Sequence, residues 1–513
     1  MAGLPARLWP DDIFGADHSA GDVTQRSVRG SVTTFGAQGA RFVLQTLTTV
    51  VLARLLSPDD FGLVAMVALV MGFAQVFKDA GLSTATIQRP SITEDQVSAL
   101  FWVNIAVSVA LMMVVSISSP LVAAFFHRPE LVPVTVALSV TFFVGGLSIQ
   151  HDALLRRRLQ FGALAVIQVV SQLTNLVVAV TVAMMPSTQK YWALVAGALA
   201  STACATVLTF YYCPLVPSRA RKGSGVRAIL SFGGQLMTFE FVNYFARNLD
   251  NLLVGRSLGS SPLGLYSKAY QLFMLPITQI RTPLSQVALP ALSRLRGEGE
   301  RYRRFYVRIV EVTAALTVPL TVYCLIEASF LVRVLLGGQW MGAVRTFQIL
   351  AIAGIVQPTA STVGLVMVSQ GRADRQLKNG LVNSLVLALA FVIGLPFGIE
   401  GVAAGFTVGS LIVVVPMLYY GFHETPIRVG DFARSVWPSV LAGVISGGLG
   451  LLAGVAAGRE SAWGHIALAS VFVLAYMAFT LPRRSVQEGI QVVRSAWVER
   501  VEVDPLPEVS PHT

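Results

Sequence analysis

The stretch VSALFWVNIAVSVALMMVVSISSPLVAAFF, residues 97–126, contains no charged side chain. An α-helix rises about 1.5 Å per residue, and the hydrocarbon core of a bilayer is about 30 Å thick. A helix of roughly 20 apolar residues therefore crosses a membrane. This stretch is longer than that, and it predicts a transmembrane helix.

The whole chain has the composition of a membrane protein. Of its 513 residues, 54% are hydrophobic and 13% are charged, and the mean hydropathy is +0.66. Soluble proteins have about 25% charged residues, so this chain has too little polar surface to cover several soluble domains. Its three cysteines lie in apolar stretches without a CxxC pair, and we interpret them as buried hydrophobic residues.

Thirteen further apolar runs are long enough to cross a bilayer, so we predict an all-α polytopic protein with about fourteen transmembrane helices. The limits of the first seven are Ser31–Leu56, Phe61–Gly81, Val97–Phe126, Leu131–Ile149, Phe161–Met184, Trp192–Tyr212 and Ala228–Leu258. Those of the second seven are Leu263–Val287, Tyr306–Ile326, Thr346–Ser369, Leu377–Leu395, Gly401–Phe422, Phe432–Ala457 and Trp463–Leu481.

The basic residues predict the orientation of these helices. Of the 38 Lys and Arg residues, 27 fall in the two tails and in every second loop, and short cytoplasmic loops retain such residues. Both termini are therefore expected in the cytoplasm, with residues 1–30 as a tail that has no signal-peptide core. The net charge of +11 reflects this topology, and no nucleic-acid partner is expected.

Two short internal repeats predict a division into halves. The segment 54–63 recurs as 256–265 with Arg, Leu, Gly and Leu at the same offsets, and FGAQ at 35–38 is echoed by FGGQ at 232–235. Paired halves are typical of transporters that work by alternating access. The predicted parts are 31–213 and 228–422 with six helices each, the basic linker 214–227, two further helices in 423–482, and a cytoplasmic tail at 483–513.

Polar side chains form stripes on four of the predicted helices. At 100° per residue, Gln38, Arg41 and Gln45 share a face about 80° wide, and so do Glu240, Asn243, Arg247 and Asp250. Weaker stripes on the fifth and eighth helices include Gln172 and Lys268. A charge at mid-bilayer costs about 2.5–3.5 kcal/mol, so these faces are expected to line a water-filled cavity. The candidate substrate-binding residues are Gln38, Arg41, Gln45, Asn243, Arg247, Lys268 and Arg281.

The positive charges on these stripes favour an anionic ligand. A phosphate or diphosphate headgroup suits the cations, and the amides and hydroxyls suit attached sugars. Other interpretations stay open: Arg247 and Asp250 could form an intrahelical pair, and Lys268 and Arg281 could reach the membrane surface from helix ends. Asp250 and Glu240 are candidates either for structural pairing or for coupling to H⁺ or Na⁺. No nucleotide-binding, metal-ligand or hydrolase motif is found, so an enzyme is not expected.

Several stretches resemble a known family. They include LARLLSPDDFGLVAM at 52–66, RNLDNLLVGRSLG at 247–259, LGLYSKAY at 263–270 and LLRRRLQF at 154–161. They are similar to the Wzx-type flippases for lipid-linked oligosaccharides, which belong to the polysaccharide-transport family of the MOP superfamily. The similarity covers roughly residues 31–482 and is greatest to the colanic acid and xanthan exporters.

The resemblance implies a V-shaped bundle of two six-helix lobes in the bacterial inner membrane, with two additional helices that form a groove for a lipid tail. It implies transport of undecaprenyl-diphosphate-linked oligosaccharide to the periplasmic leaflet without an organic cofactor, with Arg41 and Arg247 as headgroup ligands. A polysaccharide polymerase and glycosyltransferases would be its partners, besides membrane lipids. The alternatives are a MATE-like drug or toxin exporter and a non-transporting component of an assembly complex.

Overall fold

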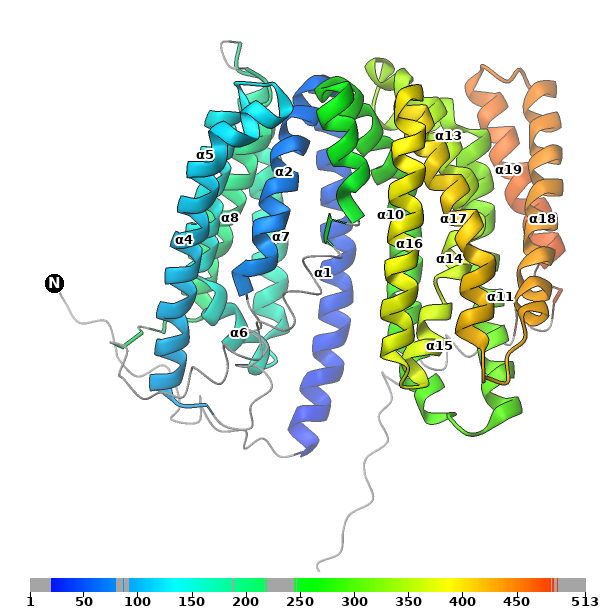
Figure 1. Ribbon diagram of the computed structural model, residues 1–513, viewed down its shortest axis with the longest axis horizontal. Coiled ribbons are helices and arrows are strands. Elements are labelled where there is room, and N and C mark those ends of the chain that lie inside the picture. Colours follow the sequence, from blue (N-terminus) through cyan, green and yellow to red (C-terminus); the bar gives the residue numbers. More distant parts are fainter. Residues whose placement is uncertain are drawn as a thin grey trace, which may run out of the picture. The chain divides into compact units, whose positions relative to one another are not determined.

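The computed structural model describes residues 20–79, 92–186, 189–215 and 247–480, together with Thr86, Pro217, Ser218, Tyr244, Phe245, Pro482, Arg483 and Gln487. All regular secondary structure in these residues is helical, which confirms the predicted all-α class (Figure 1). The chain divides into two compact units, Met1–Asn248 with Val501–Thr513, and Leu249–Arg500. The boundary between them falls inside the predicted seventh helix.

The first unit has seven helices in its described part. They are α1 (Ala20–Leu55), α2 (Pro58–Asp79), α4 (Glu94–Phe126), α5 (Leu131–Gly146), α6 (Ile149–Arg157), α7 (Phe161–Ala183) and α8 (Trp192–Tyr212). The limits of α8 are the predicted ones, whereas α1 begins well inside the predicted N-terminal tail. No proline interrupts the segment 20–30, and the helix continues through it.

The described helix end 247–258 spans the boundary between the units, and its residues 249–258 begin the second unit. This unit continues with α10 (Ser260–Arg294), α11 (Gly299–Ile326), α12 (Ala328–Leu335), η2 (Gly338–Ala343), α13 (Val344–Ala353), α14 (Gln357–Ala360) and α15 (Val363–Ser369). The last elements are α16 (Ala373–Gly394), η3 (Leu395–Phe397), α17 (Gly398–Phe422), α18 (Val429–Ala456) and α19 (Ala462–Thr480).

Eight helical stretches in the described residues are long and apolar enough to cross a membrane, and up to ten if each bent pair of helices is one span. The chain is therefore a polytopic membrane protein, although the predicted number of fourteen is not confirmed. One stretch, Asp374–Phe422, contains two helices, α16 and α17. They run antiparallel, because a Cβ on Gly401 would overlap the Gly394 carbonyl and one on Gly405 would overlap that of Ala390.

Two long helices, α1 and α10, are not among these apolar stretches, although both are long enough to cross a membrane. These are the helices with the polar stripes that contain Arg41 and Lys268. A helix whose polar face is exposed to hydrocarbon would leave those groups unsolvated. The low hydropathy of α1 and α10 therefore agrees with a position against water or protein.

Two pairs of helices are bent. The first pair is α5 and α6, which meet at an angle of 42°, and the predicted span Leu131–Ile149 ends where α6 begins. The span predicted at Thr346–Ser369 is bent by 43° between Gly338–Ala353 and Gln357–Ser369. At this second break Gly354 lies so close to its neighbours that a Cβ would be 2.6 Å from Phe273 Cε2 and 2.8 Å from Thr321 Cγ2.

The motif at 52–66 has a structural explanation in the turn between α1 and α2. The Ser57 hydroxyl and the Asp60 carboxylate cap the start of α2 reciprocally: Ser57 N donates to Asp60 Oδ2 at 2.9 Å, and Asp60 N donates to Ser57 Oγ at 3.3 Å. Pro58 occupies the first helical position, where its missing N–H costs nothing. Asp59 accepts a bond of 2.6 Å from Arg128, which precedes α5. The motif thus joins two loops at one end of the first unit.

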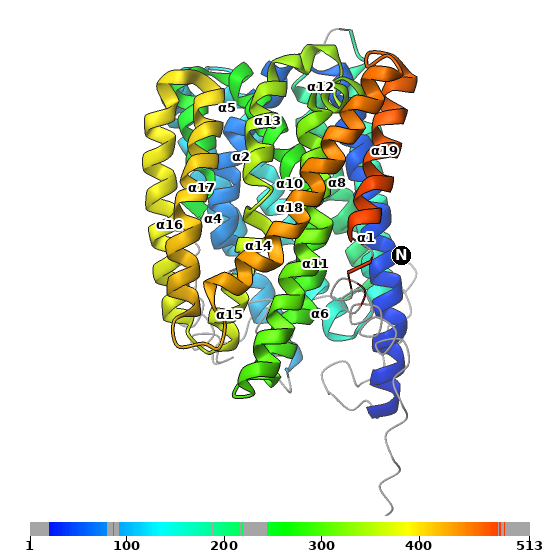
Figure 2. The ribbon, with the colours of Figure 1, turned by 90° about the vertical axis from the view of Figure 1, so that its right-hand side faces the viewer.

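The last two helices pack against α11 within the second unit (Figure 2). The Tyr476 hydroxyl of α19 donates to the Ala315 carbonyl of α11 at 3.0 Å. At the other end of α19, His465 Nδ1 lies 2.6 Å from the buried Glu327 carboxylate, which follows α11. Small residues bring α18 close to α19, because a Cβ on Gly450 would be 3.0 Å from the Leu468 carbonyl oxygen.

Candidate functional site

The polar stripe of α1 is exposed along most of its length. Gln38, Arg41 and Gln45 are all exposed, and they lie on one helix without a break. Arg41 makes no hydrogen bond or ion pair with any residue that the structure describes. No described residue therefore occupies its guanidinium group.

The end of this stripe meets the stripe predicted on the fifth span. Thr48 is buried, and its hydroxyl donates to the Leu44 carbonyl at 2.7 Å. Gln172 Nε2 of α7 donates to the same hydroxyl oxygen at 3.4 Å. This contact brings the polar faces of α1 and α7 together within the first unit.

The helix end 247–258 holds two of the predicted residues in different surroundings. Arg247 is exposed and has no hydrogen bond or ion pair among the described residues. Asp250 is 3% exposed and accepts bonds from the Tyr266 hydroxyl at 2.9 Å and from Asn251 N at 2.8 Å. The intrahelical pair of Arg247 with Asp250, which the sequence left open, is absent from the described structure. Glu240 and Asn243 lie outside the described residues.

On α10 the two predicted cations differ in their contacts. Lys268 is half-buried, and its ammonium group donates to Gln271 Oε1 at 2.9 Å, one turn further along the helix. Arg281 is exposed, and it lines a small cavity of about 110 Å³. The cavity combines a cation with several hydroxyl groups and one amide.

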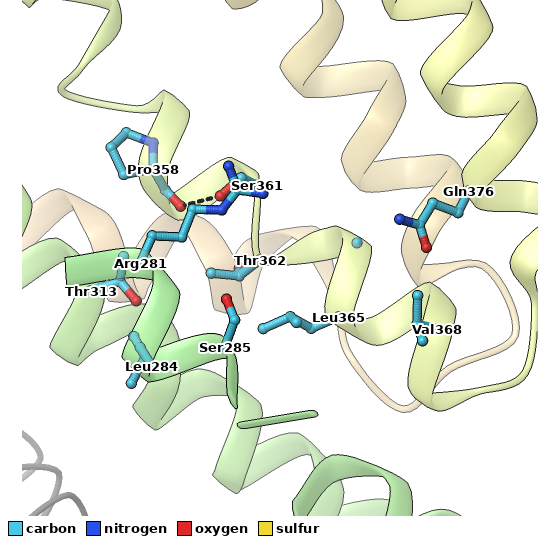
Figure 3. A pocket seen from close by; sticks show the side chains of 11 residues that line it. Arg281, Leu284, Ser285, Thr313, Pro358, Ser361, Thr362, Leu365, Val368 and Gln376 are labelled. Atoms are coloured by element: carbon cyan, nitrogen blue, oxygen red, sulfur yellow. Dashed lines mark hydrogen bonds between the residues drawn. The ribbon is translucent and has the colours of Figure 1, made fainter. Parts of the chain in front are cut away.

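Residues from five helical segments form this Arg281 cavity (Figure 3). Its polar lining consists of Arg281 and Ser285 of α10, Thr313 of α11, Ser361 and Thr362 beside α14, and Gln376 of α16. In Figure 3 the Arg281 side chain extends towards Ser361. The arginine and the amide offer donors to an anion or a sugar, and the hydroxyl oxygens offer acceptors to a sugar.

Hydrogen bonds with the protein fix the hydroxyl groups of the cavity. The Ser361 hydroxyl donates to the Pro358 carbonyl at 2.7 Å, and the Thr362 hydroxyl donates to the Thr359 carbonyl at 2.6 Å. The buried Tyr306 hydroxyl lies 2.9 Å from the Thr362 hydroxyl. Each donor is occupied, so the hydroxyl oxygens are oriented and keep acceptor capacity for a ligand.

The broken span explains why these hydroxyls face a cavity. Between α13 and α15 the helix is interrupted, and Thr321 of α11 donates to the Gly354 carbonyl at 3.2 Å. Irregular backbone at membrane depth is tolerated where it is buried in protein or lines a cavity, and transporters often bind ligands there.

The described residues contain no cluster of three or more His, Cys, Asp or Glu side chains that could hold a metal ion.

Residues 51–345, more than half of the chain, match the model of a family described as "Polysaccharide biosynthesis protein". This chain belongs to the polysaccharide biosynthesis protein family. The predicted resemblance to Wzx-type exporters is thereby confirmed.

Curated relatives carry names from polysaccharide synthesis. The chain is 29% identical over 303 residues to "Teichuronic acid biosynthesis protein TuaB" of Bacillus subtilis, a match that covers 59% of this chain and 62% of TuaB. It is 24% identical over 398 residues to "Lipopolysaccharide biosynthesis protein WzxC" of Escherichia coli, over 75% of this chain and 79% of WzxC. A third is "Succinoglycan biosynthesis transport protein ExoT" of Rhizobium meliloti, 26% identical over 63% of this chain and 65% of ExoT.

Solved structures show which fold this family member has. The lipid II flippase MurJ in an inward closed conformation has a TM-score of 0.69 at 13% identity, over 88% of this chain and 98% of MurJ. An inward-facing MATE multidrug transporter of the MOP superfamily has a TM-score of 0.61 at 13% identity, over 77% of this chain and 96% of that protein. The chain therefore has the MOP fold.

Sequence reasoning found the cations of this family member but missed the hydroxyl groups around Arg281. Ser285, Thr313, Ser361 and Thr362 were not singled out, because isolated hydroxyls in apolar runs are common. One usable signal was present: Gly354 and Pro358 interrupt the predicted span Thr346–Ser369. Such an interruption indicates a discontinuous helix.

Proposed function

We propose that this protein is a flippase that moves undecaprenyl-diphosphate-linked oligosaccharide repeat units from the cytoplasmic to the periplasmic leaflet of the bacterial inner membrane. In this proposal it serves polysaccharide biosynthesis as a transporter and not as an enzyme. Both termini lie in the cytoplasm, and a polysaccharide polymerase and glycosyltransferases act beside it. The predicted lobes, 31–213 and 228–422, alternate access to the substrate, and the helices in 423–482 accommodate its lipid tail.

The observation that carries the proposal is the presence of exposed arginines without protein partners on polar helix faces. Arg41 on α1 and Arg247 on the segment 247–258 have no described hydrogen bond or ion pair. An arginine inside a bilayer without a partner costs about 2.5–3.5 kcal/mol. A diphosphate offers bidentate acceptors that offset this cost while substrate is bound.

The Arg281 cavity supports a role in binding the polar part of the substrate. Its volume of about 110 Å³ is small, so it accommodates one phosphate or one sugar substituent rather than a whole repeat unit. The oriented hydroxyls of Ser361 and Thr362 accept hydrogen bonds, and Arg281 donates them. This combination favours a glycan diphosphate over an apolar drug.

Asp250 is the candidate for ion coupling in this proposal. Its carboxylate is buried and hydrogen-bonded to Tyr266 and Asn251, with no basic partner in the described structure. Since no arginine or lysine is bonded to this carboxylate among the described residues, it is available to bind a transported H⁺ or Na⁺. Glu240, outside the described residues, is the second candidate for coupling to H⁺ or Na⁺.

The membrane potential provides part of the driving force. With the cell interior negative, about 2.3 kcal/mol per charge per 100 mV favours outward movement of an anionic headgroup. The arginines reduce this contribution while they neutralise the diphosphate. The membrane potential therefore drives translocation only if the arginines leave part of the diphosphate charge unneutralised.

A drug exporter is the alternative that the fold permits, because a MATE transporter has the same fold. A cavity for lipophilic cations would need acidic side chains, whereas Arg41, Arg247 and Arg281 are cationic. The charge of the polar faces therefore favours the flippase.

Reconstitution tests the proposed function directly. Purified protein in liposomes should expose an undecaprenyl-diphosphate-linked oligosaccharide to an externally added glycan-modifying enzyme or lectin, at a rate that protein-free liposomes do not reach. A lipophilic cationic dye should not be transported. Transport of the dye, with no movement of any lipid-linked glycan offered, would reverse the choice between flippase and exporter.

A further inference from the structure

A second basic cavity lies between the N-terminal ends of α11 and α18, away from the Arg281 cavity. Its volume is about 370 Å³. Arginines from both helices line it: Arg303, Arg304 and Arg308 of α11, and Arg434 of α18. Three carboxylates, Glu300, Glu311 and Asp431, also line it.

One arginine of this α11–α18 cavity has a structural role. Arg303 donates to both Asp431 oxygens, from Nε at 2.8 Å and from Nη2 at 2.7 Å. Its Nη1 donates to Glu300 at 3.3 Å, and Asp431 also accepts from the backbone N of Arg428 at the start of α18. Arg303 thus joins the two helices and bonds two of the three carboxylates, and neither of these two carboxylates bonds Arg304 or Arg434 among the described residues.

Arg304 and Arg434 have no such partners. Both side chains are exposed, one on each helix, and neither makes a hydrogen bond or ion pair among the described residues. Two guanidinium groups on opposite sides of a cavity each present a pair of parallel N–H donors to its interior. Phosphate esters match this geometry.

The surface of α18 next to the cavity is apolar. Trp437, Leu441 and Val444 follow Arg434 on one face of the helix, with exposed fractions of 64%, 47% and 58%. Tryptophan is enriched where a membrane protein meets the lipid headgroups. A basic cavity that continues into an exposed apolar helix face matches the two parts of a phospholipid.

We propose that the α11–α18 cavity binds the phosphate of an anionic phospholipid, whose acyl chains lie along the Trp437 face of α18. Arg304 and Arg434 contact the phosphate, while the Arg303–Asp431 bond fixes the width of the cavity. Phosphatidylglycerol binds in preference to phosphatidylcholine, because the four arginines of the lining outnumber its three carboxylates and repel the cationic choline headgroup. The phosphate site has other lining residues than the Arg281 cavity, and its test uses no transported substrate, although α18 belongs to the helices proposed to accommodate the lipid tail of that substrate.

Native mass spectrometry of the full-length protein in detergent tests this site. Phosphatidylglycerol and phosphatidylcholine with identical acyl chains are titrated against wild type and the double variant Arg304→Gln, Arg434→Gln. The expected result is retention of phosphatidylglycerol by wild type and at least about tenfold weaker retention by the variant. Millimolar inorganic phosphate should not displace the lipid from wild type.

A matched control removes two charges from the same end of the unit outside the cavity. Arg294→Gln, Arg301→Gln has the same net charge as the cavity variant, and neither residue lines the cavity. It should bind phosphatidylglycerol as wild type does. Equal loss in both double variants, no loss in the cavity variant, or displacement by inorganic phosphate would each overturn the proposal. The single variant Arg434→Gln, which removes an exposed side chain without partners, gives the same readout if the double variant does not fold.

Discussion

The Tyr266 hydroxyl donates a hydrogen bond of 2.9 Å to the Asp250 carboxylate, and both residues are almost completely buried. The bond joins the segment 247–258 to α10 across the turn at Gly259. Both residues lie in the stretches 247–259 and 263–270 that resemble polysaccharide exporters. This hydrogen bond gives a structural reason for the presence of Asp250 and Tyr266 in these two stretches. The contact joins two helices, so the spacing of residues along one helix did not predict it.

Tyr266→Phe should destabilise the second unit, because it removes one of the bonds that compensate the buried carboxylate. A hydrogen bond to a charged group contributes about 1.5–3 kcal/mol. We expect a lower thermal unfolding midpoint in detergent for Tyr266→Phe and a smaller decrease for Tyr270→Phe, whose hydroxyl does not bond Asp250. An unchanged midpoint would show that the Tyr266 bond is not stabilising.

Asp250→Asn separates the structural role of this carboxylate from ion coupling. The amide oxygen still accepts from Asn251 N and the amide NH₂ donates to the Tyr266 hydroxyl oxygen, but the side chain cannot exchange a proton near neutral pH. Under a pH gradient, the variant should lose the stimulation of lipid-linked oligosaccharide flipping while its unfolding midpoint stays near that of wild type. Stimulation equal to wild type would remove Asp250 as the coupling residue.

Gly354→Ala should disturb the broken span and the Arg281 cavity. The added Cβ would lie 2.6 Å from Phe273 Cε2 and 2.8 Å from Thr321 Cγ2, and overpacking of this kind costs about 1–3 kcal/mol. Thermal unfolding measures the loss. Gly380→Ala on α16 is the control, because no atom lies within 4 Å of its Cβ position. Equal effects of the two substitutions would contradict the close approach at Gly354.

Arg281→Gln should slow flipping without unfolding the protein. The variant removes the charge that faces Ser361 and Thr362 and keeps a polar side chain, so the rate of glycan translocation should fall by about tenfold, as expected for one lost charged contact. Thr278→Ala, one turn earlier on α10, is the control, since its hydroxyl bonds only backbone carbonyls of its own helix. A wild-type rate for Arg281→Gln would exclude this cavity from transport.

Ser57→Ala should lower stability without affecting substrate binding. The substitution removes the hydroxyl that caps α2, and loss of such a cap costs about 1 kcal/mol. The control is Ser384→Ala on α16, because the Ser384 hydroxyl donates a hydrogen bond to the Gly380 carbonyl of its own helix and caps no helix end. If Ser57→Ala unfolds at the temperature of wild type, the motif at 52–66 needs another explanation.

Hydrophobic run length predicted most helices of this protein well. Continuous apolar runs such as 97–126 and 192–212 define helices α4 and α8 with few errors, because a bilayer leaves the backbone no other way to satisfy its hydrogen bonds. The break at 354–356 was missed, whereas the predicted span Leu131–Ile149 ends within a few residues of the bend at 147–148. Hydropathy does not register a bend, and at the second break the cause is the close packing of Gly354 against Phe273 and Thr321, which come from other helices.

The candidate site was predictable only in part, for a related reason. Helical periodicity identifies residues on one face, and it correctly placed Gln38, Arg41 and Gln45 together on the exposed side of α1. It gives no information on partners from other helices, such as Tyr266 for Asp250 or Gln172 for Thr48. The Arg281 cavity likewise depends on hydroxyls from three separate helical segments.

The most direct test of the central claim is the flipping rate of the double variant Arg41→Ala, Arg247→Ala in liposomes with an undecaprenyl-diphosphate-linked oligosaccharide. The control Arg294→Ala, Arg301→Ala removes two arginines outside the proposed site. At equal amounts of inserted protein, we expect translocation to fall by at least about a hundredfold in the first variant, as expected for two lost charged contacts, and to stay near wild type in the control. Translocation at the wild-type rate by the Arg41, Arg247 variant would contradict a headgroup site built on these arginines.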